Sequence, residues 1–164
     1  MRHPPLLDLS ALDLDRVVVT KEEIYRVMPH RHEMALLDGL LYFDRERGEA
    51  VALHEVHDDE FWVRGHIPGR PLMPGVLLIE AMAQAAGYLI LSLGDFQRMP
   101  FLAQVQGAKI RSPVLPGTAL LVDARRIHAG SGYAVLEGAV RRETGEERRP
   151  VAEAELRFRV GLSQ

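Results

Sequence analysis

The stretch that decides the fold covers residues 65–87 and reads GHIPGRPLMPGVLLIEAMAQAAG. Its first half places three prolines and three glycines around His66, which restricts the path of the backbone. Its second half opens an apolar segment, residues 76–93, whose length and composition predict a buried helix. Glu80 lies inside that segment, although burying an unpaired carboxylate is costly. The stretch therefore predicts a central helix in which something compensates the charge of Glu80.

The composition is that of one globular domain. Of the 164 residues, 47% are apolar and 26% charged, so the chain is long enough for one sizeable core. A net charge of -3 gives no bulk attraction to nucleic acid or to an anionic membrane, and we expect neither as a partner. The chain has no cysteine, which excludes a disulfide framework and thiolate ligands and favours the reducing cytoplasm.

The order of the expected elements predicts the fold class. Residues 1–19 should form an extended or partly mobile arm with at most an edge strand, because HPP disfavours helix. Thr20 and Glu23 have the spacing of a capping box, which predicts a short helix that ends at Pro29. Alternating apolar residues then predict a hairpin, and four more strands should follow the long helix. The hairpin strands are expected near residues 40–44 and 49–56, and the later strands at residues 101–111, 119–129, 133–143 and 151–160.

Strands that follow one another through short turns should pair antiparallel, as a meander. The fold class is therefore α+β, with an antiparallel sheet wrapped around one long central helix. We expect residues 20–164 to form a single domain that follows the N-terminal arm of residues 1–19.

Several polar groups of the long helix and the preceding loop suit acid–base chemistry. Glu80 and Gln84 are four residues apart, so Gln84 can orient the carboxylate by a hydrogen bond, and Tyr88 continues the same stripe. Gly75 would offer its backbone N–H at the positive end of the helix to a developing oxyanion, such as that of a polarised thioester. Histidine exchanges protons near neutral pH, which makes His66 the candidate acid or base on the loop.

The remaining histidines predict no metal centre. His30 and His32 are two residues apart, and His54 and His57 are three apart, but neither pair has an evident third ligand. The sequence also lacks a glycine-rich phosphate loop, a dinucleotide fingerprint and a nucleophile elbow. We therefore expect acid–base chemistry without a metal ion or another cofactor.

Taken together, these motifs resemble a known family. GHIPGRPLMPGVLLIEAMAQ, with MPHR and LLD before it and AKIRSPVLPG after it, closely resembles the 3-hydroxyacyl-[acyl-carrier-protein] dehydratases of fatty acid synthesis. The resemblance covers about residues 21–160 and implies a hot-dog fold. It also implies homodimers, often assembled as trimers of dimers, with active-site tunnels at the dimer interface. The substrate would be a (3R)-hydroxyacyl chain on the phosphopantetheine of acyl carrier protein, and the product a trans-2-enoyl chain.

The resemblance also implies roles for individual residues. His66 and Glu80 match the catalytic histidine and carboxylate, which the family draws from the two protomers of a dimer. Gly75 matches the glycine that polarises the thioester carbonyl, and Gln84 the glutamine that holds the carboxylate. Which of His66 and Glu80 handles each proton stays open.

An acidic carrier protein would favour a basic rim around the site. The candidate contacts are Arg64, Arg70, Lys109 and Arg111, which flank the motif or its expected neighbouring strand.

The sequence departs from the family pattern at a few positions. Ile67 replaces the usual aromatic residue after the histidine, PHRHEMALL replaces a segment with a tyrosine–proline pair, and the arm is longer than a typical start. Three other functions therefore stay open: an acyl-thioester hydrolase that uses Glu80 to activate water, a hydratase of enoyl-coenzyme A, and a non-catalytic acyl-binding subunit. The joint presence of an acid–base pair and an oxyanion group favours the dehydratase.

Overall fold

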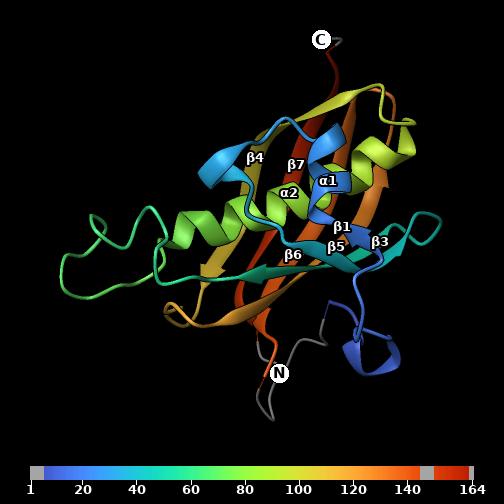
Figure 1. The fold of residues 1–164 in the computed structure, drawn as a ribbon. Helices are drawn as coiled ribbons and strands as arrows, with labels where there is room; N and C mark the ends of the chain where they lie inside the picture. Colours follow the sequence, from blue (N-terminus) through green and yellow to red (C-terminus); the bar gives the residue numbers. More distant parts are fainter. Residues whose placement is uncertain (1–5, 145–149, 163–164) are drawn as a thin grey trace.

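The helix α2, Gly75–Leu93, is the centre of the fold, and a twisted sheet wraps around it (Figure 1). Every residue from Ala81 to Ser92 is buried, which explains why the segment is apolar on all faces. Gly94 forms the C-cap, as its position after the apolar segment predicts. The central helix that the sequence predicts is confirmed.

The computed structural model describes residues 6–144 and 150–162. Outside α2, the described chain forms one further α-helix, two short 3-10 helices and seven strands. These elements are η1 (Leu9–Ala11), β1 (Val19–Thr20), α1 (Lys21–Val27), η2 (His32–Met34), β2 (Gly39–Asp44), β3 (Glu49–Glu55), β4 (Met99–Ile110), β5 (Ala119–Ala129), β6 (Tyr133–Arg142) and β7 (Pro150–Leu162).

The short helix α1 begins at the predicted capping box. The Thr20 side chain accepts a hydrogen bond from Glu23 N, and the Glu23 carboxylate accepts one from Thr20 N at 2.8 Å. The helix ends just before Pro29, which cannot continue it. α1 contacts α2 through the hydrogen bond from Tyr25 to Gln84, and it brings Ile24 and Tyr25 into the core.

The strands pair antiparallel in the order β1-β2-β3-β5-β6-β7-β4. The predicted hairpin is β2–β3, and β5, β6 and β7 form a meander. The expectation that all four later strands follow chain order is wrong for β4, which pairs with β7 at the far edge. The reason is that α2 carries the chain across the sheet before β4 begins. Residues 111–118 then return to β5 without forming a hairpin.

Small residues let the sheet approach α2 closely. Ala81, Ala85 and Ala86 are fully buried against the strands. Gly138 of β6 faces Met82 of α2 so closely that an added Cβ would lie 2.9 Å from Met82 Cβ. The core is therefore thin at this helix, and side-chain volume there is tightly limited.

The opposite face of the sheet carries a second, smaller apolar cluster, which we call the outer-face cluster: Leu7, Leu9, Leu41, Val51 and Leu121. Side chains alternate along a strand, so Val51 faces outward while Ala50 and Ala52 face α2. The arm thus packs on the sheet through its leucines. The edge strand allowed for in the arm is confined to Val19–Thr20, whereas Leu9–Ala11 forms a 3-10 turn; residues 1–5 lie outside the described residues.

By length and composition alone, α2 is the one helix in the described chain that could cross a membrane. Its apolar residues are largely buried by the fold, and this burial accounts for the composition.

Candidate active site

Glu80 lies in the second turn of α2, and Gln84 lies one turn further along the same face. Gln84 Nε2 donates a hydrogen bond of 2.8 Å to Glu80 Oε1, the contact that the four-residue spacing predicts. The Glu80 side chain is 26% exposed, so the carboxylate that was expected to be buried is half-buried. The carboxylate lies at the edge of the core, where it keeps its charge and can reach a ligand.

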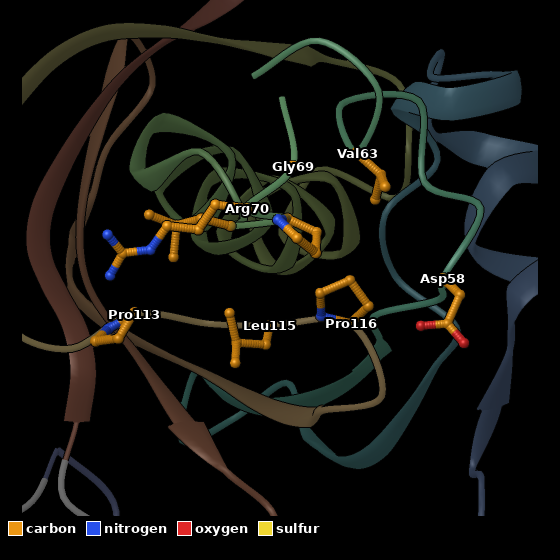
Figure 2. A pocket seen from close by; sticks show the side chains of 9 residues that line it. Asp58, Val63, Gly69, Arg70, Pro113, Leu115 and Pro116 are labelled. Atoms are coloured by element: carbon orange, nitrogen blue, oxygen red, sulfur yellow. The ribbon is translucent and has the colours of Figure 1, made fainter. Parts of the chain in front are cut away.

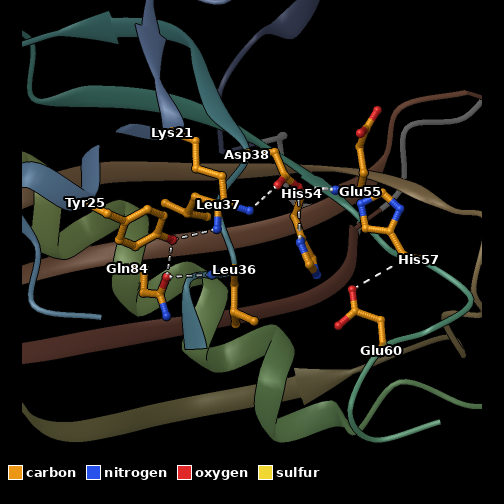
Figure 3. A network of polar contacts seen from close by, with 10 residues as sticks. All are labelled: Lys21, Tyr25, Leu36, Leu37, Asp38, His54, Glu55, His57, Glu60 and Gln84. Carbon is orange, nitrogen blue, oxygen red and sulfur yellow. Dashed lines mark hydrogen bonds and ion pairs between the residues drawn. The ribbon is translucent and has the colours of Figure 1, made fainter. Parts of the chain in front are cut away.

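The Gln84 side chain is buried, and both of its polar atoms have partners. Figure 3 shows the two hydrogen bonds that its oxygen accepts. Its amide nitrogen also donates to Met34 O at 2.7 Å. Its oxygen accepts from Tyr25 Oη at 2.7 Å and from Leu36 N at 3.2 Å. A flipped amide would place its oxygen against two other oxygens, so the network fixes the NH₂ group toward Glu80.

Tyr25 of α1 connects this glutamine to the backbone. Its hydroxyl accepts a hydrogen bond of 2.7 Å from Leu37 N while it donates to Gln84. Burial raises the pKa of Tyr25, so the hydroxyl keeps its proton and remains a donor. The sequence does not predict that Tyr25 contacts Gln84, because its helix is predictable but the direction of its side chain is not.

His30 is the second partner of Glu80. It lies between α1 and η2, and its Nε2 is 3.2 Å from Glu80 Oε1. An ionised carboxylate only accepts hydrogen bonds, so Nε2 carries the proton of this pair. The His30 bond lowers the pKa of Glu80, burial acts in the opposite direction, and the Gln84 bond adds to the lowering. Glu80 is therefore ionised at neutral pH.

An apolar cavity of about 280 Å³ opens beside this carboxylate. Apart from His30 and Glu80, all of its lining residues are apolar: Met28, Pro29, Ala83, Gly87, Met99, Pro100, Phe101, Leu102 and Phe158. Gly87 adds to the space, since a Cβ there would touch the end of the Met28 side chain. Such a cavity suits a ligand with one polar end and an apolar tail.

His66 lies on the exposed loop that leads into α2, apart from this cavity. Its ring Nδ1 is 2.7 Å from the carbonyl oxygen of Leu72, and its backbone N–H donates to the Trp62 carbonyl. A carbonyl oxygen only accepts, so Nδ1 carries the proton and Nε2 of the neutral ring is the basic nitrogen. Within the described residues, His66 neither contacts Glu80 nor lines its cavity. One copy of the chain therefore does not bring the two candidate catalytic residues together.

A second cavity, of about 530 Å³, separates this loop from residues 113–116 (Figure 2). Proline residues form much of its wall, and Asp58 and Arg70 contribute charged groups. The loop is tied to the opposite wall by a hydrogen bond from Met73 N to Val114 O at 2.9 Å. The base of the loop is thereby fixed relative to the sheet.

Gly75 is the first residue of α2, and Pro74 precedes it as the N-cap. The first N–H groups of a helix have no partner within the helix and carry its positive dipole end. A side chain at Gly75 would overlap the end of Ile110 of β4. A larger residue at this position would therefore require the exposed Ile110 side chain to move.

The four basic residues named as carrier contacts lie in two different surroundings. Lys109, near the end of β4, and Arg111, just after it, share Glu153 of β7 as an ion-pair partner. Arg64 and Arg70 are exposed on the loop and form no ion pair with any described residue. Only the loop arginines are therefore available to an acidic partner without breaking an existing pair.

A separate polar network lies at the start of β2 and the end of β3 (Figure 3). Asp38 accepts hydrogen bonds from Lys21 Nζ at 2.7 Å and from Glu55 N at 2.8 Å, and His54 Nδ1 lies 3.7 Å away. Burial alone would raise the pKa of Asp38, but the contacts with His54, Lys21 and Glu55 lower it to about 2. This network ties α1 to the hairpin.

No group of three or more metal-ligating side chains lies together in the part of the chain that the structure describes. The pairs weighed in the sequence are used otherwise: His30 contacts Glu80, while His54 lies beside Asp38.

Comparison with known proteins identifies the family. The model of the FabA-like domain matches residues 28–155. The chain belongs to the FabA-like family. Among curated relatives, the 3-hydroxyacyl-[acyl-carrier-protein] dehydratase FabZ of Protochlamydia amoebophila is 34% identical over 91% of this chain and 90% of its own. The protein of the same name from Thermus thermophilus is 42% identical over 83% of this chain and 93% of its own.

Solved structures support the same fold for this FabA-like chain. The dehydratase heterocomplex ApeI:P of Xenorhabdus doucetiae has a TM-score of 0.69 at 15% identity, over 90% of this chain and 93% of that one. A thioesterase of Haemophilus influenzae has a TM-score of 0.59 at 15% identity, over 75% of this chain and 77% of that one. At such identities the likeness concerns the fold alone, and it confirms the hot-dog fold expected from the motifs.

The FabA-like match contains His30, His66, Gly75, Glu80 and Gln84 but not α1. Tyr25 therefore lies outside the matched region, although it contacts Gln84 directly. His30 lies inside it, in MPHR, but no sequence pattern connects it with Glu80, which follows fifty residues later.

Proposed function

We propose that this FabA-like chain dehydrates (3R)-hydroxyacyl chains on acyl carrier protein to trans-2-enoyl chains in fatty acid synthesis. One observation carries the proposal: an ionised Glu80, held by Gln84 and His30, lies at the polar end of an apolar cavity. A 3-hydroxyacyl thioester has a matching shape, with polar groups at one end and an apolar tail. Relatives that are 34% to 42% identical carry the name of this activity.

The reaction removes one hydrogen from C2 and the hydroxyl from C3. In our proposal Nε2 of His66 takes the C2 proton, a double bond forms between C2 and C3, and the bond from C3 to oxygen breaks. The departing hydroxyl takes the same proton from His66 and leaves as water, so the ring returns to its neutral form. A positioned acid or base of this kind contributes about 10²- to 10⁴-fold to the rate.

Glu80 would orient the hydroxyl in this scheme. Because the His30 bond lowers the pKa of Glu80, a proton for the leaving group is more readily supplied by His66 than by the carboxylate. An ionised Glu80 accepts a hydrogen bond from the substrate hydroxyl and fixes the C3 oxygen. The N–H of Gly75 would stabilise the negative charge that develops on the thioester oxygen.

The site needs His66 from a second copy of the chain. Within one copy, His66 and the Glu80 cavity lie apart, so a homodimer that exchanges these loops would complete two sites at once. Assembly into a trimer of dimers would follow the family.

The edge strand β4 offers the surface for this dimer. It lies at the end of the sheet, and Phe101, Leu102, Val105 and Ile110 of this strand are exposed. Val76 of α2 is also 69% exposed. A long apolar edge is a site for pairing with another strand, and a second copy of β4 would cover it. Phe101 and Leu102 also line the Glu80 cavity, so the same surface would close the tunnel.

The carrier protein would dock at the loop that holds His66. Arg64 and Arg70 have no acidic partner among the described residues, whereas Lys109 and Arg111 share Glu153. We assign Arg64 and Arg70 the main electrostatic contacts, with Lys109 and Arg111 at the margin. The reaction uses no cofactor, and we place the enzyme in the cytoplasm.

A spectrophotometric assay of enoyl-thioester hydration and its reverse tests this function. Carrier-protein and coenzyme A substrates of several chain lengths would be compared, with Glu80→Gln and His66→Ala as the catalytic variants. We expect turnover by the wild type that falls at least a hundredfold in both variants, with a preference for the carrier. A folded wild-type dimer without turnover on any chain length would contradict the proposal.

A further inference from the structure

Among the residues that the structure describes, Glu80 has two polar partners, and one of them belongs to its own helix. Gln84 is four residues away, as sequence spacing predicts, but His30 arrives from the loop between α1 and η2. His30 and Glu80 are also the two polar members of an otherwise apolar cavity wall. Their contact therefore stands where a substrate would meet the carboxylate.

The surroundings of His30 do not explain it as a structural residue. Its Nδ1 is buried and forms no hydrogen bond with any described residue. A buried polar atom without a partner is unfavourable, and an apolar ring would avoid that loss. Among the described residues, the polar contact that the His30 ring makes is the one to Glu80.

We propose that His30 is a positioning residue for Glu80: its Nε2–H fixes one carboxylate oxygen and holds the other toward the cavity. This inference rests on the proposed function and adds a residue to it. Gln84 and His30 both contact Oε1 of Glu80. The second oxygen is therefore left to accept from the substrate hydroxyl.

The charge state of Glu80 provides a test besides activity. The bond from His30 acts first among the causes that lower the pKa of Glu80, and Gln84 adds a smaller contribution. The strands that line the cavity, β4 and β7, present only apolar residues to it. Tyr25 lies one hydrogen bond further away, behind Gln84. Loss of the His30 donor should therefore raise the pKa of Glu80 without compensation from another described group.

The experiment compares His30→Phe, which keeps a ring but removes the donor, with His30→Gln, whose amide can still donate to Glu80. His128, exposed and stacked on Tyr133, provides the matched control as His128→Phe. Each dimer would be assayed for kcat and KM, and the Glu80 carboxyl would be titrated by ¹³C NMR, with Glu80→Gln to assign its signal. Thermal melting would confirm that each variant is folded.

We expect His30→Phe to lose on the order of 10- to 100-fold in kcat, the range for a hydrogen bond to a charged group, and to raise the pKa of Glu80. His30→Gln should stay close to the wild type in both readouts, and His128→Phe should not differ from it. If His30→Phe fails to fold, His30→Leu takes its place.

Two results would overturn the inference while leaving the proposed function intact. The first is an active wild type whose kcat and Glu80 pKa are both unchanged in His30→Phe. The second is an equal loss in His30→Gln and His30→Phe with no change in the Glu80 pKa, which would assign the ring a packing role. An inactive wild type would instead contradict the proposed function, while the titration would still decide whether His30 sets the charge of Glu80.

Discussion

Removing the hydroxyl of Tyr25 should destabilise the protein and disturb Glu80 together. In Tyr25→Phe, the buried Leu37 N–H loses its partner, which costs about 1–3 kcal/mol. Gln84 Oε1 loses one of two hydrogen bonds and keeps that from Leu36 N, a loss of about 0.5–1.5 kcal/mol. The free energy of unfolding should therefore fall by about 1.5–4.5 kcal/mol in total.

For a chain of this size, such a loss lowers the melting temperature by roughly 5–15 °C. The value of kcat should also fall, because the Gln84 amide that orients Glu80 loses one of its four hydrogen bonds and is held less firmly. Scanning calorimetry and the hydration assay would measure the two effects on the same sample.

Tyr88→Phe is the matched control. Tyr88 is also buried and packs against the rings of Phe43 and Phe96, but its hydroxyl forms no hydrogen bond with a described residue. Its loss should change the melting temperature little. If the melting temperatures of Tyr25→Phe and Tyr88→Phe were both within about one degree of the wild type, the reasoning about the Gln84 network would be refuted.

Three further predictions concern stability. The pKa of Asp38 is lowered to about 2, so its contribution is present above the unfolded value near 3.8 and is lost as the pH falls through about 2. Asp38→Asn should therefore lower the free energy of unfolding, measured in urea at pH 7, by about 1–2 kcal/mol. An equal difference between the wild type and the variant at pH 2 would contradict this. Gly138→Ala places a methyl group against Met82 and should destabilise the protein by about 1–3 kcal/mol. The control Gly132→Ala, whose methyl group meets open space, should have little effect, and equal melting curves of the two variants would refute the packing argument. Leu9→Ala should cost about 2 kcal/mol through the outer-face cluster but leave kcat at low temperature unchanged, and an unaltered melting temperature would show that the arm does not stabilise the sheet.

Local signals in the sequence were sufficient for most of the fold. The capping box of Thr20 and the apolar run of α2 each depend on neighbours within a few residues, and both elements form where they were expected. The position of β4 depends on where α2 delivers the chain, which no local pattern encodes. The presence of the strands was therefore predictable. Their order in the sheet was predictable only where strands that follow one another in the chain pair directly, as in β2–β3 and β5–β6–β7.

The same distinction holds for the candidate site. Gln84 lies one helical turn from Glu80, so their hydrogen bond follows from spacing. The contacts of Tyr25 and His30 bridge fifty or more residues, and they depend on how α1 and the loop after it pack on α2. The prolines and glycines of the sequence predicted the His66 loop, but they did not predict how far this loop lies from Glu80.

The central claim is that Glu80 of one copy works with His66 of another. Mixing the inactive variants His66→Ala and Glu80→Gln after subunit exchange tests it directly, because a mixed dimer contains one site with both residues intact. With random exchange of equal amounts, we predict recovery of about a quarter of wild-type activity, since half of the dimers are mixed and each has one working site of two. No recovery in a mixture shown by mass spectrometry to contain mixed dimers would contradict the shared site.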